Sequence, residues 1–240
     1  MTEYVIHPLV VGMNQTDQGI MTYLRGYGRR IWIPIYVFYL EGGDRKILVD
    51  TGLEQFRVPP DVAAEYGLEP LEFEAALAKV GLKPEDVDII IHTHLHNDHC
   101  ENTYKCPNAK VYVQKAEYEF LLNPHPVDHR YFPDILDGLD VVTVEGDTEI
   151  ADGISVMLTP GHTPGGQSVV VNTAAGKAII TGFCCNRENF PDRGGVITPG
   201  VHINAIEAYE SARRVREAAD TLIPLHDLAV GRQSWGLPQA

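Results

Sequence analysis

Short apolar runs rich in β-branched and aromatic residues recur along the chain, and glycine, proline, asparagine or aspartate bounds each of them. Runs of this length and composition are typical of buried or half-buried β-strands. They predict strands at residues 31–42, 45–52, 87–94, 109–114, 154–160, 167–173 and 177–182. The segment NTAAGKA between the last two predicts a hairpin, in which Gly176 can adopt a positive φ angle.

Helical periodicity is confined to fewer segments. Residues 70–82 carry apolar positions at helical spacing and a stop signal at Gly81, and residues 204–220 begin with an Asn204 cap and Glu207 three positions later. Residues 115–122 are a shorter candidate. Strands in two runs, with helices between and after them, predict an α/β protein of two sheets covered by helices.

Composition and charge exclude several classes of partner. The chain has 240 residues, 19 Lys and Arg against 33 Asp and Glu, and a net charge of -14. Such a surface repels phosphate backbones and anionic lipid, so we expect neither nucleic acid nor a membrane as partner. No linker divides the chain, which predicts one domain over residues 1–240.

The four cysteines do not form a disulfide framework in so long a chain, and the N-terminus lacks the pattern of a secretory signal. We therefore expect a cytoplasmic protein. The proline-rich segment 123–138 predicts a loop. Its composition is consistent with a pocket wall, an ordinary solvated loop or the contact of a homodimer.

A cluster of histidines follows the apolar strand VDIII in the segment HTHLHNDHC. Residues two apart at a strand end point to the same side, so His94 and His96 should converge, with Asp98 and His99 close by in the next turn. Imidazole and carboxylate ligands suit zinc, and iron or manganese would also accept them. For His7, His92 and His202 we expect ordinary surface or core roles.

The pattern H-x-H-x-D-H after an apolar strand resembles the signature of the metallo-β-lactamase superfamily. Three further segments, ILVDTG, TPGHTPGGQSVVV and LIPLHD, resemble this family in the same order along the chain. The resemblance implies an α/β protein with a four-layer αβ/βα sandwich (the metallo-β-lactamase fold) and metals at one edge between the sheets. It assigns His94, His96 and His162 to one metal, Asp98, His99 and His226 to a second, and Asp50 to the support of the histidines. Two zinc ions are expected, or one.

The segment TGFCC departs from the family pattern. Two-metal members have a bridging aspartate directly after such a Thr-Gly pair, and Phe183 stands there instead. A strained vicinal disulfide is disfavoured in a reducing compartment. Two readings remain open for Cys184 and Cys185: both are buried apolar filler, or one of them donates a thiolate to the metal, for which Cys184 is the candidate.

Within the superfamily, the chain is similar to quorum-quenching lactonases that open N-acyl homoserine lactones. The resemblance implies a small-molecule substrate, attack of a metal-bound hydroxide on the ester carbonyl, and Asp98 as the group that carries a proton to the leaving alkoxide. Asn186 stands where these lactonases have a substrate-contacting tyrosine, and it is the candidate substrate-binding residue. The alternatives are a thioesterase, a cyclic-amide hydrolase, or a non-catalytic ligand-binding member with an incomplete metal site.

Overall fold

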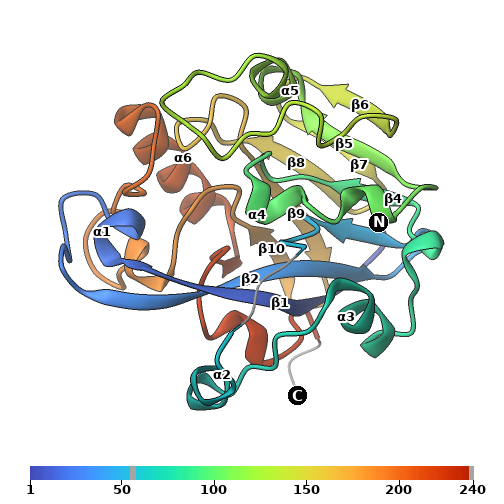
Figure 1. The fold of residues 1–240 in the computed structure, drawn as a ribbon, viewed down its shortest axis with the longest axis horizontal. Coiled ribbons are helices and arrows are strands. Elements are labelled where there is room, and N and C mark those ends of the chain that lie inside the picture. The colour runs from blue at the N-terminus through green and yellow to red at the C-terminus, as the bar shows by residue number, and fades with distance from the viewer. Residues whose placement is uncertain (55–57, 238–240) are drawn as a thin grey trace.

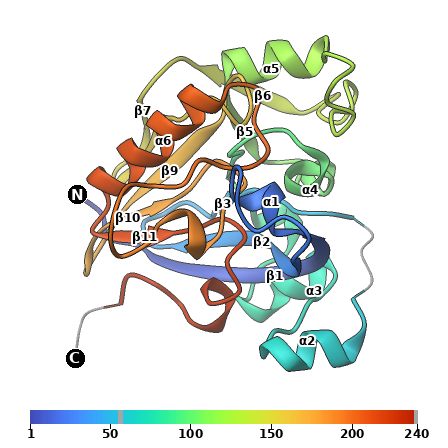
Figure 2. The same ribbon diagram turned by 90° about the vertical axis from the view of Figure 1, so that its left-hand side faces the viewer.

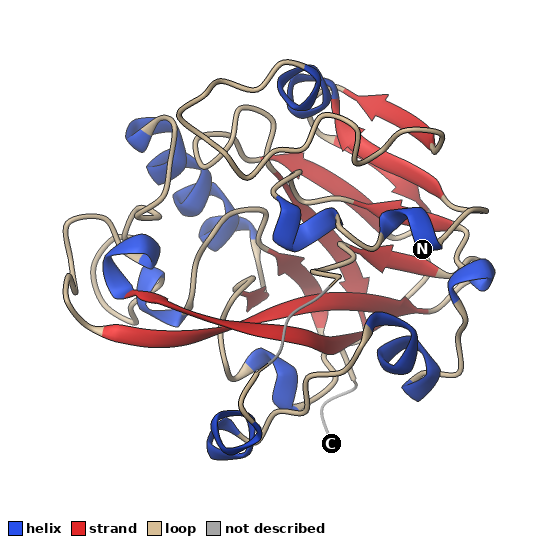
Figure 3. Cartoon of the chain, in the orientation of Figure 1, coloured by secondary structure: helices blue, strands red, loops and turns tan. Residues whose placement is uncertain are grey.

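Two β-sheets form the centre of the protein (Figures 1 and 3). A computed structural model describes residues 1–54 and 58–237. The first sheet has the order β1-β2-β3-β4-β5-β6 and the second the order β11-β10-β9-β8-β7. The strands are β1 (Val5–Asp17), β2 (Arg30–Glu41), β3 (Ile47–Val49), β4 (Ile89–Ile91), β5 (Lys110–Gln114), β6 (Asp140–Val144), β7 (Thr148–Ala151), β8 (Ile154–Leu158), β9 (Gln167–Thr173), β10 (Gly176–Ile180) and β11 (Thr221–Ile223).

The connections between strands include short helices and the longer α6. The α-helices are α1 (Gln18–Met21), α2 (Pro60–Tyr66), α3 (Phe73–Lys79), α4 (Asn97–Cys100), α5 (Lys115–Leu122) and α6 (Ala205–Ala218). Single 3-10 turns are η1 (Pro84–Asp86), η2 (Thr103–Lys105), η3 (Arg187–Asn189) and η4 (Val230–Arg232). Among the described residues, no helix has the length and apolar character that crossing a membrane requires.

Strand β2 is buried on both faces, which explains its nearly unbroken apolar sequence. Tyr36, Phe38 and Leu40 pack into the core between the two sheets, together with residues of β8, β9 and β10. Val37 and Tyr39 point the other way, into a cluster with the side chains of α3. Because side chains alternate along a strand, a strand between two layers needs apolar residues at every position.

Helices cover the outer face of each sheet, so the protein has four layers. On the first sheet, Phe73 and Leu77 of α3 and Leu121 of α5 are buried against the strands. On the second sheet, Ala212 and Val215 of α6 pack against apolar side chains that include Ile179, and α6 lies beside β9 and β10 in Figure 2. The predicted αβ/βα sandwich is confirmed.

Helix α6 also holds the loop that follows β8. The Asn204 side chain accepts hydrogen bonds from the N–H groups of Ile206 and Glu207, which confirms the predicted cap. Gly161 has a φ of 115°, and a Cβ added there would lie 2.1 Å from the backbone nitrogen of Ala208. Only glycine allows this approach, which places the next residue, His162, between α6 and the first sheet.

The sequence pattern found the central strands but not all of the outer ones. Each of the seven predicted strands overlaps a strand of the structure, and α3, α5 and α6 lie within their predicted ranges. Gly176 has the expected positive φ, as does Gly81 after α3. Strands β1, β6, β7 and β11 and the short helices α1, α2 and α4 were missed. Strand β1 contains Pro8 and a bulge between Val10 and Gly12, which an edge strand tolerates because one of its sides has no partner strand among the described residues.

Candidate metal centre

Three segments that each follow a core strand bring potential metal ligands together. The segment after β4 carries four of them, and the segments after β8 and β11 carry one each. The resulting groups are His94, His96 and His162, and Asp98, His99 and His226. Within each group, the ligand atoms lie within 4.8 Å of one another. The structure therefore brings together the five histidines and the one aspartate that the resemblance assigned to two metals.

In the first group, the outer nitrogen of each imidazole has a hydrogen-bond partner that fixes the tautomer. His162 Nδ1 donates to the carbonyl oxygen of Val201 at 2.7 Å, and His96 Nε2 donates to Asp128 Oδ2 at 2.9 Å. His94 Nδ1 lies 3.0 Å from Thr93 Oγ1, whose own proton is given to Asp50, so His94 is the donor here too. Each imidazole thus turns an unprotonated nitrogen inward.

The second group has the same arrangement. His226 Nδ1 donates to the carbonyl oxygen of Pro34 at 2.9 Å, and His99 Nδ1 donates to Asp50 Oδ2 at 2.9 Å. The inward Nε2 of His99 lies 3.5 Å from Asp98 Oδ2. Pro34 can provide its carbonyl because β3 pairs only with residues 38–40 of β2.

In the first group, the inward-facing nitrogens are acceptors without protons, and they lie close together. His94 Nε2 and His162 Nε2 are only 3.3 Å apart. Two such lone pairs repel each other unless a cation lies between them, and their outer protons point away from the gap. The donor sets therefore fit divalent cations of the type that histidine and carboxylate bind.

Burial and mutual repulsion keep most of these imidazoles neutral. Burial, with the neighbouring histidines, holds the pKa of His94 and of His162 well below the usual range. Burial and then His99 lower the pKa of His226 to about 4. The exception is His99: burial opposes its protonation, but Asp98 and Asp50 outweigh burial and raise its pKa. The two carboxylates thus favour positive charge at this position.

Asp50 lies beside the second ligand group, and its supporting role stays a prediction. Its side chain is fully buried, and it accepts hydrogen bonds from the Thr93 N–H at 2.7 Å and hydroxyl at 2.8 Å as well as from His99. Burial alone would raise its pKa, but the charge of His99, its hydrogen bond and the His92 imidazole 3.5 Å away lower it to about 2. Asp50 thus remains ionised and holds the segment after β4 from behind.

The sequence reasoning missed two residues beside His96. Asp128 accepts the hydrogen bond of His96 and also a two-pronged ion pair from Arg130, at 2.7 and 2.6 Å. Burial opposes the charge of Asp128, but His96 and Arg130 hold its pKa far below the usual range. The single available signal was the only Asp-x-Arg in the loop 123–138, which periodicity cannot distinguish from ordinary loop sequence.

The segment TGFCC brings no carboxylate to the centre. Phe183 and Cys185 are buried in the cluster beneath α6, and Cys185 lies 3.1 Å from Thr181 Oγ1. A Cβ added at Gly182 would lie 1.9 Å from the carbonyl oxygen of Gln167. Cys184 lines the cavity that both ligand groups also line, here called the metal cavity. Its sulfur lies 3.5 Å from Met21 Sδ but belongs to neither of the two ligand groups. Burial, then Asp98, raises the pKa of this thiol.

One cavity is lined by both ligand groups, and two further cavities adjoin it. The metal cavity has a volume of about 580 Å³, and residues 127–130 of the predicted loop form part of its wall. A second cavity, of about 670 Å³, adjoins it at His226 and is lined by Asn186. Asn186 caps η3 and donates to Gln18 Oε1 at 3.3 Å. The structure thus places Asn186 beside the metal cavity, and its role in substrate binding stays a prediction.

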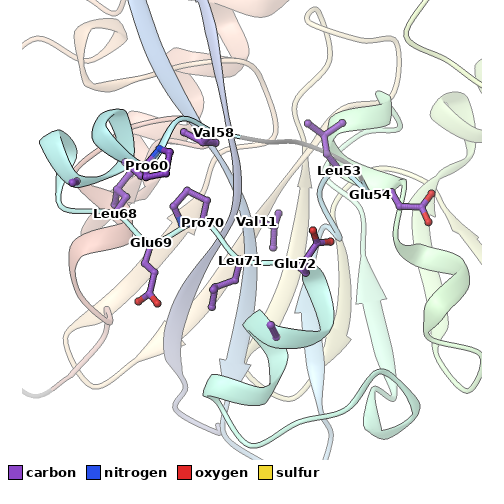
Figure 4. Close-up of a pocket in the computed structure, with 13 residues that line it drawn as sticks. Val11, Leu53, Glu54, Val58, Pro60, Leu68, Glu69, Pro70, Leu71 and Glu72 are labelled. Carbon is purple, nitrogen blue, oxygen red and sulfur yellow. The ribbon is translucent and has the colours of Figure 1, made fainter.

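The third cavity, of about 620 Å³, lies between β1, α2 and the start of α3. In Figure 4, Val11 stands in the middle, with Leu53 and Glu54 on the opposite side from Pro60 and Leu68. Leu53 also lines the metal cavity, so the two cavities are neighbours.

Comparison with known proteins places the chain in a family. Residues 30–182 match the sequence model of the metallo-beta-lactamase superfamily. The chain belongs to this superfamily. An N-acyl homoserine lactonase of Bacillus cereus is 32% identical over 203 residues, which span 79% of this chain and 78% of that protein. An N-acyl homoserine lactonase of Bacillus thuringiensis is 30% identical over 218 residues, 84% of each protein.

A solved structure has the same architecture. It is an N-acyl homoserine lactone hydrolase with the product N-hexanoyl-L-homoserine bound at its catalytic metal centre. The TM-score is 0.78 at 26% identity, and the match covers 95% of each chain. The resemblance to this superfamily and to its lactonases, and the fold that it implied, are confirmed.

Proposed function

We propose that the protein is a metal-dependent hydrolase that opens lactones. The observation that carries this proposal is the pair of three-ligand groups that line one cavity. The relatives named as N-acyl homoserine lactonases support the same reaction class.

We assign one metal to His94, His96 and His162 and a second to Asp98, His99 and His226, with zinc as the expected ion. The nitrogen-rich donor sets support zinc, whereas iron and manganese accept the same ligands. When bound, these metals polarise the ester carbonyl and lower the pKa of water. Outside the two groups, Cys184 is the candidate for a further ligand, because its side chain is the one from TGFCC that lines the cavity.

The protein's own residues then position the reactants and move a proton. The side chain of Asp98 is 28% exposed, within the cavity. Burial opposes its charge, but His99, His226 and His96 keep its pKa below the usual range. An ionised carboxylate at this position can accept a proton at Oδ1 or Oδ2 and deliver it to the leaving alkoxide of the opened ring.

The walls of the cavities support a substrate with an apolar, uncharged substituent. Aliphatic side chains of Ile20, Ile33, Leu53, Val127 and Val201 line the metal cavity around its polar floor. Beyond Leu53, the cavity of Figure 4 continues with mostly aliphatic residues and three glutamates. Negative charge at that position would repel a substituent that carries a carboxylate.

The experiment is elemental analysis of the purified protein, followed by a pH-indicator assay over panels of lactones, thioesters and cyclic amides. We expect about two equivalents of metal and hydrolysis chiefly of N-acyl lactones. His162→Ala should lose metal and activity together. Turnover of thioesters or cyclic amides alone would favour the alternative hydrolases, and a metal-free protein without turnover would favour a ligand-binding member.

The cytoplasmic location, the homodimer and the single domain stay predictions. The core shared by strands of both sheets supports one domain. The four cysteines, all in the described part of the chain, are free thiols, as a reducing compartment would leave them.

A further inference from the structure

The carboxylate of Glu117 is completely buried and connects two loops of the metal centre. Glu117 lies in the first turn of α5 and has no exposed surface. Its Oε1 accepts hydrogen bonds from the backbone N–H of Leu95 at 3.0 Å and from the hydroxyl of Tyr131 at 2.6 Å. Its Oε2 accepts one from the backbone N–H of Gly165 at 2.9 Å. Both oxygens are therefore committed to neutral donors.

The two backbone donors stand beside metal ligands that come from different sheets. Leu95 lies between His94 and His96, in the segment after β4 of the first sheet. Gly165 lies three residues after His162, in the segment after β8 of the second sheet. One side chain thus fixes the backbone on both sides of the first ligand group.

Close packing leaves little freedom in this arrangement. A Cβ added at Gly165 would lie 2.3 Å from the backbone nitrogen of Glu117, so the loop touches the start of α5 directly. Tyr131, which donates to Glu117, also packs its ring edge-to-face on His96, with ring centroids 4.9 Å apart. A change in the carboxylate is therefore transmitted to the ligands through contacts that cannot relax easily.

A separate contact holds the same two segments together nearer to the sheets. The N–H of Gln167 donates to the carbonyl oxygen of Thr93, and its side-chain Nε2 donates to the carbonyl oxygen of His92, both at 2.8 Å. This contact remains when Glu117 is altered. Loss of the carboxylate should therefore disturb the spacing of the ligands more than the packing of the sheets.

We propose that Glu117 is a positioning residue for the metal bound by His94, His96 and His162. Its carboxylate sets the distance between the two loops and, through it, the distance between their ligand nitrogens. The proposal rests on the proposed function, because that function assigns a metal to this group.

The test compares Glu117→Gln with Glu119→Gln, which makes the same chemical change on the exposed side of α5. An amide has one acceptor and one donor end, so it can keep a hydrogen bond with only one of the two N–H groups. Zinc affinity is measured by competition with a chromophoric chelator. The absorption spectrum of the cobalt-loaded protein reports the ligand geometry.

We expect Glu117→Gln to bind one equivalent of zinc about tenfold or more weakly than wild type and to shift the cobalt bands. Glu119→Gln should match wild type in both measurements. A Glu117→Gln protein with wild-type affinity and spectrum would overturn the positioning role, even if urea unfolded it more easily. A wild-type protein that binds no zinc would overturn the proposed function as well.

Tyr131→Phe keeps the proposal testable if Glu117→Gln does not fold. This variant removes one of the three hydrogen bonds but keeps the ring on His96 and both backbone contacts. We expect zinc affinity to fall by about threefold, with a smaller shift of the cobalt bands. Wild-type affinity in Tyr131→Phe, together with a Glu117→Gln protein that cannot fold, would assign Glu117 to folding and reject the positioning role.

Discussion

Asp50→Asn should weaken both the metal-free fold and the second metal site. Asn keeps the size of the side chain, and it tolerates the left-handed backbone at this position, where φ is 58°. It cannot accept all three hydrogen bonds, since one end of the amide is a donor. If the NH2 group of the amide faces His99 Nδ1, two hydrogen-bond donors meet. His99 must then move its proton to Nε2, which can no longer bind a metal.

The magnitude follows from the pKa of Asp50. Its value of about 2 in the folded protein lies below its ordinary value of 3.8. This difference corresponds to about 2 kcal/mol of stabilisation by the ionised carboxylate. Because the folded-state pKa is the lower one, the stabilisation is fully present above about pH 4 and is lost as the pH falls through about 2.

The assay is urea unfolding of the metal-free proteins, with Asp137→Asn as a control at an exposed aspartate. At pH 7, Asp50→Asn should lower the free energy of unfolding by about 2 kcal/mol, and this deficit should shrink as the pH approaches 2. Affinity for the second metal should fall by about 10- to 100-fold. Equal stability at pH 7 together with unchanged metal affinity would refute the role assigned to Asp50.

Two further substitutions test separate parts of the structure. Asn204→Ala removes the acceptor for the N–H groups of Ile206 and Glu207 and should cost about 1 kcal/mol in urea unfolding; an unchanged midpoint would show that this cap does not stabilise α6. Cys184 lines the metal cavity whereas Cys185 is packed beneath α6, so iodoacetamide should modify Cys184 first, slowly at pH 7 because its pKa is raised, and mass spectrometry should show this. Protection of Cys184 by zinc would support Cys184 as a metal ligand. Faster labelling of Cys185 than of Cys184 would contradict the burial of Cys185 beneath α6.

The sequence predicted the elements whose side chains pack against a layer of strands or helices, and those set by local capping. Strand β2 is apolar throughout because it lies between two layers, and Asn204 marks the start of α6 through chemistry confined to a few adjacent residues. Strand β1 escaped prediction because edge pairing tolerates Pro8 and a bulge, so its pattern has no clear period. Helix α2 is short and has few apolar positions to bury.

The candidate metal ligands were predictable because a strand end and a recognisable motif place them together. The residues that form hydrogen bonds with the ligands and their loops were harder to predict from sequence. Asp50 was predicted through its motif, whereas Asp128 and Glu117 form hydrogen bonds with residues far away in sequence. A carboxylate in a loop or on a short helix has no sequence signature that distinguishes a buried acceptor from a solvated charge. Such roles emerge only when the chain is folded.

The tight backbone contact at Gly182 restricts how this lineage could acquire a different ligand set. A side chain at Gly182 would collide with the carbonyl of Gln167, and a polar residue in place of Phe183 would enter the apolar cluster under α6. Cys184 is the position of this segment that opens into the cavity. A carboxylate could therefore be introduced at Cys184 by a single amino-acid substitution. At Gly182 or Phe183, the surrounding backbone or core would have to change as well.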